Sequence, residues 1–280
     1  MLVDSAWLFE QITNENQEIR IIDCRFDLSN ASAGRTLYHE GHIPGAVYFD
    51  LEKDLSGEVQ LHGGRHPLPS LKSFGAQLEC YGISKHHILV MYDGGEYAFA
   101  MRMAWMMKYV GHEQVFILNG GFLNWQKQRL PVTKEIPHYP KSVYEICMDT
   151  SILATYEEVH AVVENKQDAI LIDSREHNRF LGVEEKIDKK AGHIPTAINF
   201  PFTEGIQNGF FLSANKQAER FPKWEKHQPL IVYCGSGVTA TPNYFALKVA
   251  GYSNVKVYIG SFSDWISYDE NEVATGKAHL

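Results

Sequence analysis

The sequence predicts an α/β protein of two tandem domains, each a parallel sheet with helices on both faces. Two observations predict this fold: blocks of sequence that occur twice in the same order, and short apolar runs that alternate with helical stretches. The length of 280 residues is sufficient for two ordinary domains, and the apolar content of 44% is typical of folded proteins.

Four blocks of the sequence are repeated. The pairs are IIDCR with LIDSR, GHIPGA with GHIPTA, ILVMYD with PLIVYC, and FILNGGFLNW with VYIGSFSDW. Four blocks in the same order indicate duplication of a domain-sized unit of about 120 residues. We therefore expect a first domain at 1–138, a second at 150–280, and an extended linker at 139–149 in a stretch interrupted by prolines.

The predicted strands are short and apolar on both faces. In the first copy they are IRIIDC, AVYFD, HILVMYD and QVFILNG, and in the second AINF, PLIVYC and KVYIG. Helical stretches such as AFAMRMAWMMKYVG lie between them. Strands of this kind, alternating with helices, are typical of a parallel sheet covered on both sides. Ligands of such sheets bind outside the carboxyl ends of the strands.

One predicted strand leads directly into a glycine-rich loop. Residues 230–241 read LIVYCGSGVTAT, with Cys234 at the end of the strand and a helix expected to begin near Thr239. Gly235 and Gly237 allow successive backbone N–H groups to point inward and form an anion-binding nest. The N-terminus of the following helix adds further N–H groups, so this loop favours a thiolate.

The other three cysteines lack such a setting. We therefore expect Cys24, Cys80 and Cys147 to be inert residues of the core or of the surface. The four cysteines are widely spread and form no C-x-x-C pair, which indicates a reduced, cytoplasmic protein.

The charge and hydropathy of the chain exclude several classes of partner. A formal net charge of −8 argues against nucleic acid and anionic membranes. No secretory signal is recognised, and no apolar stretch approaches the roughly 18 residues of a membrane helix. The histidines at 62, 66, 86 and 87 are not accompanied by the ligands of a zinc site, so no metal is expected.

The CGSGVTA loop, the two copies and the GHIPGA-like turns resemble the rhodanese family, and the loop is similar to its mercaptopyruvate sulfurtransferase branch. The resemblance implies two tandem rhodanese-like domains without metal or organic cofactor. It implies that Cys234 takes sulfane sulfur from a small donor and becomes a persulfide. The sulfur then passes to cyanide or to a thiol acceptor such as a thioredoxin-like reductant.

The resemblance also implies which residues bind the donor. They are Arg179, His66 and the loop residues Gly235, Ser236, Gly237, Val238 and Thr239. A relay associated with the mercaptopyruvate branch would consist of Ser236, His66 and Glu52.

Two features of the sequence bear on which donor is used. The positions directly after the cysteine are neutral, whereas the thiosulfate branch has basic residues there, and this favours mercaptopyruvate. The second arginine of the family, expected before GHIP, is absent from EEKIDKKA at 184–191, where Lys186, Lys189 or Lys190 could substitute. Thiosulfate therefore stays open as an alternative donor.

The first copy has Asp93 where the second has the nucleophile. A carboxylate cannot carry sulfur, so the first domain is expected to be catalytically inactive.

Two other functions would use the same loop. A cysteine phosphatase needs an arginine six residues after its cysteine, and this chain has Ala240 there, which argues against it. A non-enzymatic sulfur-relay or redox-sensing module would need Cys234 but could dispense with Arg179.

Overall fold

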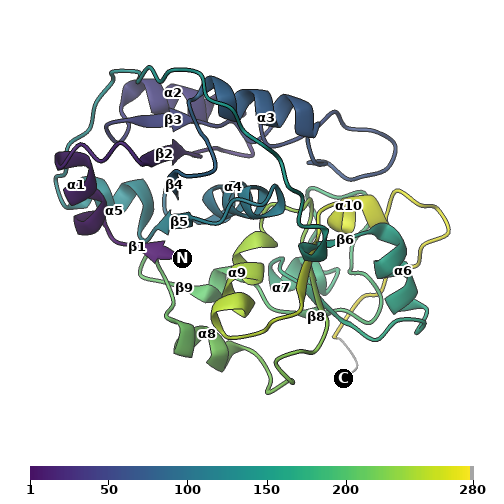
Figure 1. Cartoon of the computed structure of the whole chain (residues 1–280). Coiled ribbons are helices and arrows are strands. Elements are labelled where there is room, and N and C mark those ends of the chain that lie inside the picture. Colours follow the sequence, from purple (N-terminus) through teal and green to yellow (C-terminus); the bar gives the residue numbers. More distant parts are fainter. Residues whose placement is uncertain (278–280) are drawn as a thin grey trace. The chain divides into compact units, whose positions relative to one another are not determined.

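The computed structural model of the chain describes residues 1–277, which form two compact units (Figure 1). The first unit consists of 1–57, 68–149 and 208–211. The second consists of 58–67, 150–207 and the chain from Leu212 onward. The short segment 58–67 thus belongs to the second unit although it lies within the first copy of the repeat.

The first unit contains a five-stranded parallel sheet. Its strands are β1 (Leu2–Val3), β2 (Ile19–Asp23), β3 (Ala46–Tyr48), β4 (Ile88–Tyr92) and β5 (Val115–Leu118), in the order β1-β5-β4-β2-β3. Its helices are α1 (Ser5–Thr13), α2 (Ala33–Glu40), α3 (Leu71–Cys80), α4 (Ala98–Tyr109) and α5 (Gly121–Lys127).

The second unit contains a second five-stranded parallel sheet. Its strands are β6 (Leu153–Ala154), β7 (Ile170–Asp173), β8 (Ile198–Asn199), β11 (Leu230–Tyr233) and β12 (Val255–Tyr258), in the order β6-β12-β11-β7-β8. Its helices are α6 (Tyr156–Val163), α7 (His177–Phe180), α8 (Ala214–Arg220), α9 (Thr241–Val249) and α10 (Ser261–Trp265). The remaining short elements of the chain are η1 (Thr150–Ile152), η2 (Phe202–Gly205), β9 (Ile206–Gln207) and β10 (Phe210–Phe211).

The two sheets have the same strand order, position for position, as a duplicated domain requires. The prediction of two α/β domains with parallel sheets is confirmed. No helix within residues 1–277 is both long enough and apolar enough to cross a membrane.

The central strand β11 shows why the sheet of the second unit is covered on both faces. Ile231 and Tyr233 belong to a buried cluster with side chains of α6, α7 and α10. Leu230 and Val232 alternate with them and therefore point to the opposite face, where α9 packs on β11 and β12. All four side chains are buried, so the strand reads as one continuous apolar run.

An aspartate–arginine pair explains why two of the repeated blocks occur together. The Asp173 carboxylate accepts from the backbone N–H of Arg175 at 2.9 Å and from its Nη2 at 2.6 Å. The same Nη2 donates to the Gly192 carbonyl oxygen at 2.7 Å, in the GHIPTA block. In the first unit Arg25 makes the equivalent bond to the Gly41 carbonyl at 2.8 Å. The arginine of one block thus holds the turn of the other.

Two buried histidines make the first unit sensitive to mild acid. Burial lowers the pKa of His87 and of His112 to about 4. Both rings accept a hydrogen bond on Nδ1, from the Ser84 N–H at 2.9 Å and from the Tyr144 hydroxyl at 3.0 Å. An unfolded histidine titrates near 6.5, so the unfolded chain binds more protons than the native one between pH 6.5 and 4. The stability is therefore fully present above pH 6.5 and is lost as the pH falls.

We expect the free energy of unfolding of the first unit to fall by about 1 kcal/mol per histidine between pH 7 and 5.5. Urea unfolding across this range measures the effect. The variant His112→Asn removes one titrating ring and should lose about 1 kcal/mol less than the wild type over the same interval. A wild-type stability that does not change between pH 7 and 5.5 would contradict the prediction.

Candidate active site

The predicted reactive loop lies at the carboxyl end of the central strand of the second unit. Strand β11 ends at Tyr233, Cys234 follows directly, and α9 begins at Thr241 with Pro242 in its first turn. The helix starts two residues later than Thr239 because the Val238 carbonyl first accepts the N–H and the hydroxyl of Thr241, at 3.2 and 2.8 Å, which closes a turn.

The sulfur of Cys234 lies inside this loop. The N–H of Gly237 donates to Sγ at 3.1 Å, and the Cys234 side chain is 1% exposed. The backbone N–H of Cys234 donates to the Ser261 hydroxyl at 3.1 Å. That hydroxyl donates in turn to the Tyr258 carbonyl at 2.8 Å and lies 3.9 Å from Sγ. A negative charge on the sulfur would therefore face the Gly237 N–H, while the Ser261 hydroxyl holds the backbone of Cys234.

Gly237 can only be a glycine. Its φ of +76° lies in the left-handed region, and a Cβ there would collide with the carbonyl oxygen of Ile259. The backbone therefore approaches strand β12 closely, and this approach places the Gly237 N–H on the sulfur.

Ser236 and His66 meet in the second unit. The Ser236 hydroxyl lies 2.8 Å from His66 Nδ1, and both residues are buried. His66 reaches this place because segment 58–67 belongs to the same unit. Glu52, the third member of the expected relay, belongs to the first unit, where its N–H donates to Asp50 at 3.0 Å. The complete relay stays a prediction.

Arg179 lies close to the loop and is held by two carboxylates. Its Nε and Nη2 donate to Glu185 at 3.0 and 3.1 Å, and Nη2 also donates to Asp188 at 2.8 Å. Its Nη2 is 3.6 Å from the position that a Cβ on Gly235 would occupy. The guanidinium is thus adjacent to the residue that follows Cys234.

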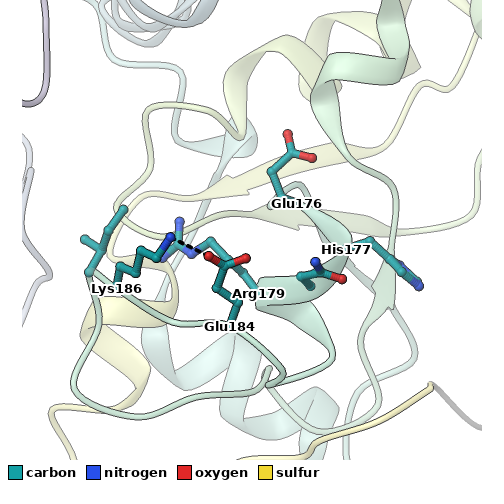
Figure 2. A pocket seen from close by; sticks show the side chains of 7 residues that line it. Glu176, His177, Arg179, Glu184 and Lys186 are labelled. Atoms are coloured by element: carbon teal, nitrogen blue, oxygen red, sulfur yellow. Dashed lines mark ion pairs between the residues drawn. The ribbon is translucent and has the colours of Figure 1, made fainter.

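Arg179 also lines a cavity of about 500 Å³ (Figure 2). Its lining residues are Glu176, His177, Asn178, Arg179, Glu184, Lys186 and Ile187. Lys186 forms an ion pair with Glu184 at 2.5 Å on an exposed part of the wall. Cys234 is not among the lining residues, so the cavity adjoins Arg179 rather than the cysteine.

The second cation near the loop is Arg65, which the sequence did not suggest. Its Nη2 is 3.0 Å from the position of a Cβ on Gly235, and its Nη1 forms an ion pair with Asp188. Its backbone N–H donates to the Ser263 hydroxyl at 3.1 Å. A lysine from 184–191 was expected to replace the second arginine of the family. The structure places Arg65, from a distant segment, beside the loop.

The rhodanese-like domain family matches residues 5–128 and 155–268. The chain belongs to the rhodanese-like family. It is 37% identical over 265 residues to a "Probable 3-mercaptopyruvate sulfurtransferase" of Pseudomonas aeruginosa, which covers 92% of this chain and 93% of the relative. It is 34% identical to the thiosulfate sulfurtransferase of Mus musculus, over 99% of this chain and 96% of the relative.

The fold agrees with a solved structure of the same family. The crystal structure of a 3-mercaptopyruvate sulfotransferase from Escherichia coli has a TM-score of 0.82 and 32% identity, and covers 94% of this chain and 98% of that chain. These relatives are sulfurtransferases, and each matches this chain over nearly its whole length. The chain is therefore a sulfurtransferase rather than a non-enzymatic module.

In the first rhodanese-like unit, a carboxylate occupies the corresponding loop. Asp93 accepts the N–H groups of Gly95, Tyr97, Phe99 and Ala100 at 3.0, 3.1, 3.2 and 3.1 Å. Burial raises the pKa of Asp93, and the four N–H groups partly offset that rise. The nest is thus filled by a side chain of the protein itself.

Three residues of the site were missed from the sequence: Arg65, Asp188 and Ser261. The sequence gives one signal for Ser261, which is that the first copy has Gly121 at the same place. The structure shows that both residues have a positive φ, so the serine stands where a glycine would fit without strain. Arg65 and Asp188 carry no such signal. Within residues 1–277, no three His, Cys, Asp or Glu side chains are grouped so that they could hold a metal ion.

Proposed function

We propose that Cys234 carries the sulfur as a persulfide, taking it from a mercaptopyruvate-like donor and passing it to a thiol or cyanide. The Gly237 N–H on the sulfur, at 3.1 Å, is the observation that carries this proposal. A fixed amide donor stabilises both the attacking thiolate and the negatively charged outer sulfur of the product.

The first half-reaction moves one sulfur atom without an external oxidant. The Cys234 thiolate attacks the sulfur of mercaptopyruvate and forms the S–S bond. The C–S bond of the donor breaks, its electron pair stays on carbon, and the enolate takes up the thiol proton to give pyruvate. In the second half-reaction the acceptor attacks the outer sulfur, which regenerates the thiolate and yields thiocyanate from cyanide or a persulfide from a thiol.

Ser236, His66 and Arg179 have separate roles in this proposal. The Ser236 hydroxyl, held at 2.8 Å from His66, is suited to hydrogen-bond the donor's carbonyl oxygen as it becomes an enolate. Arg179 is suited to the donor's carboxylate through Nη1, because its Nε and Nη2 donate to Glu185 and Asp188. Gly235, Val238 and Thr239 shape the loop around them.

Thiosulfate is the second candidate donor. Relatives of comparable similarity are named for each of the two donors. Thiosulfate would leave as sulfite after the same attack on its outer sulfur, so the persulfide is common to both. A thiol acceptor, such as a thioredoxin-like protein, needs a reducing compartment, and we therefore place the reaction in the cytoplasm. The first domain, with Asp93 in its loop, is proposed to be inactive.

Mass spectrometry of the intact protein tests the proposal. After incubation with mercaptopyruvate or thiosulfate, the mass should rise by one sulfur atom, and dithiothreitol should reverse the change. The variant Cys234→Ser should gain no sulfur and should lose turnover with both donors while remaining folded. A mass gain that persists in this variant would place the sulfur on another residue and refute the assignment.

A further inference from the structure

Backbone hydrogen bonds hold segment 58–67 against the rest of the second unit. The Gly63 N–H donates to the Asp264 carboxylate at 2.6 Å, and the Arg65 N–H donates to the Ser263 hydroxyl at 3.1 Å. Gly64 has a φ of +79°, and a Cβ there would collide with the Gly260 carbonyl oxygen. These contacts hold the residues on either side of Arg65 against the start of α10.

Side chains on both sides of Arg65 add to these contacts. His62 stacks on Tyr268 with ring centroids 4.0 Å apart, and its Nδ1 lies 2.7 Å from the Ser267 hydroxyl. His66 lies 2.8 Å from Ser236. The backbone of Arg65 is therefore fixed on both sides, and its side chain starts from a defined place beside the loop.

A single buried carboxylate holds the two guanidinium groups. The Asp188 side chain is 1% exposed and forms ion pairs with Arg65 Nη1 and with Arg179 Nη2. The Arg65 side chain is 34% exposed and that of Arg179 is 21% exposed, so solvent and solutes reach both cations. Asp188 is paired with Nη1 of Arg65, and Nη2 lies beside Gly235.

We infer that Arg65 is a second donor-binding arginine, which acts with Arg179 to bind the anionic group of the sulfur donor next to Cys234. Asp188 is the positioning residue that holds the two guanidinium groups together. This inference rests on the proposed function, since it names a residue that recognises the donor.

The chemistry of both candidate donors fits this arrangement. Mercaptopyruvate carries a carboxylate and thiosulfate carries sulfonate-like oxygens, and a guanidinium donates to either through parallel N–H groups. Gly235 has no side chain, so nothing at that position separates Arg65 from the donor. A segment from the other copy of the repeat thus brings the N–H donors of a guanidinium to a loop that has no basic side chain of its own.

Steady-state kinetics of Arg65→Met tests the role in donor binding. Hydrogen bonds to a charged group contribute about 1.5–3 kcal/mol, so kcat/KM should fall roughly tenfold to hundredfold, mainly through KM. Arg65→Lys keeps the charge but not the planar pair of N–H donors, so its kcat/KM should lie between those of Arg65→Met and the wild type. Lys216→Met, which removes an exposed cation on α8 of the same unit, is the control and should leave KM unchanged.

The two donors distinguish what Arg65 recognises. A higher KM for mercaptopyruvate alone would assign Arg65 to a carboxylate, a higher KM for thiosulfate alone to sulfonate oxygens, and a rise for both to anions in general. An unchanged KM for both donors in Arg65→Met would overturn the inference.

Alkylation of Cys234 tests anion recognition without any sulfur transfer. Peptide mass spectrometry can follow the modification of Cys234 by iodoacetate, an anion, and by iodoacetamide, its neutral counterpart. Arg65→Met should lower the ratio of the iodoacetate rate to the iodoacetamide rate at least about fivefold, because only the anionic reagent loses a partner. An unchanged ratio would contradict an anion site beside the sulfur, whether or not the persulfide forms.

Discussion

Replacing Gly237 with alanine is expected to lower kcat/KM for sulfur transfer at least about 100-fold, the effect of removing one fixed N–H donor in other enzymes. The φ of +76° is unfavourable for alanine, and the new Cβ would collide with the Ile259 carbonyl oxygen on the backbone that follows β12. The loop must shift to relieve this collision, and the N–H of residue 237 then leaves the sulfur of Cys234. Steady-state rates with both donors measure the effect.

A matched glycine separates this effect from backbone strain. Gly251 also has a positive φ, +94°, and lies in the same unit, but a Cβ there would meet only side-chain carbons of Lys226 at 3.9 Å. Gly251→Ala should therefore cost about 1 kcal/mol of stability and leave kcat/KM within about twofold of the wild type. If Gly237→Ala kept wild-type rates, the amide contact to the sulfur would have no part in the reaction.

The fold could be predicted because its signals are local. Strands buried on both faces appear as apolar runs, and the duplication fixes the order of the strands in both copies together. The loop of Cys234 could be predicted equally well from the sequence, since a strand, Cys234, Gly235 and Gly237 lie within a few residues of one another. Each of these inferences depends on neighbours in sequence.

Arg65, the proposed second donor-binding residue, could not be predicted in the same way. Arg65 lies in one copy of the repeat and Gly235 in the other, and no periodicity or spacing relates them. What joins them is the attachment of segment 58–67 to the second unit through backbone groups. Such a contact depends on the position of the turn in the folded protein. The sequence around Arg65 predicts only a loop and does not reveal what the loop contacts.

The other large effect is expected on stability, from Asp173→Asn. Asp173 is fully buried and the Arg175 side chain is 1% exposed. Burial alone would lower the pKa of Arg175, but the Asp173 carboxylate outweighs it and the pKa is raised above its usual value. Asparagine in place of Asp173 leaves the guanidinium buried with Glu185 at 3.5 Å as its remaining ion-pair partner among the described contacts. Breaking one side of a buried ion pair typically costs about 3–5 kcal/mol, and this is the loss we expect in the unfolding free energy of the second unit.

A double-mutant cycle shows whether the pair is responsible. The variant that combines Asp173→Asn with Arg175→Met removes the buried charge itself, so it should lose less stability than the sum of the two single variants. Asp23→Asn is the matched change in the first unit, where Arg25 makes the same contacts, and it should weaken that unit by a similar amount. Additive losses in the cycle would mean that Asp173 and Arg175 contribute to stability independently, and that the ion pair is not the cause. Because each arginine also donates to the carbonyl of its GHIP turn, we expect the loss to appear there first, as faster amide exchange around Gly192 in Asp173→Asn.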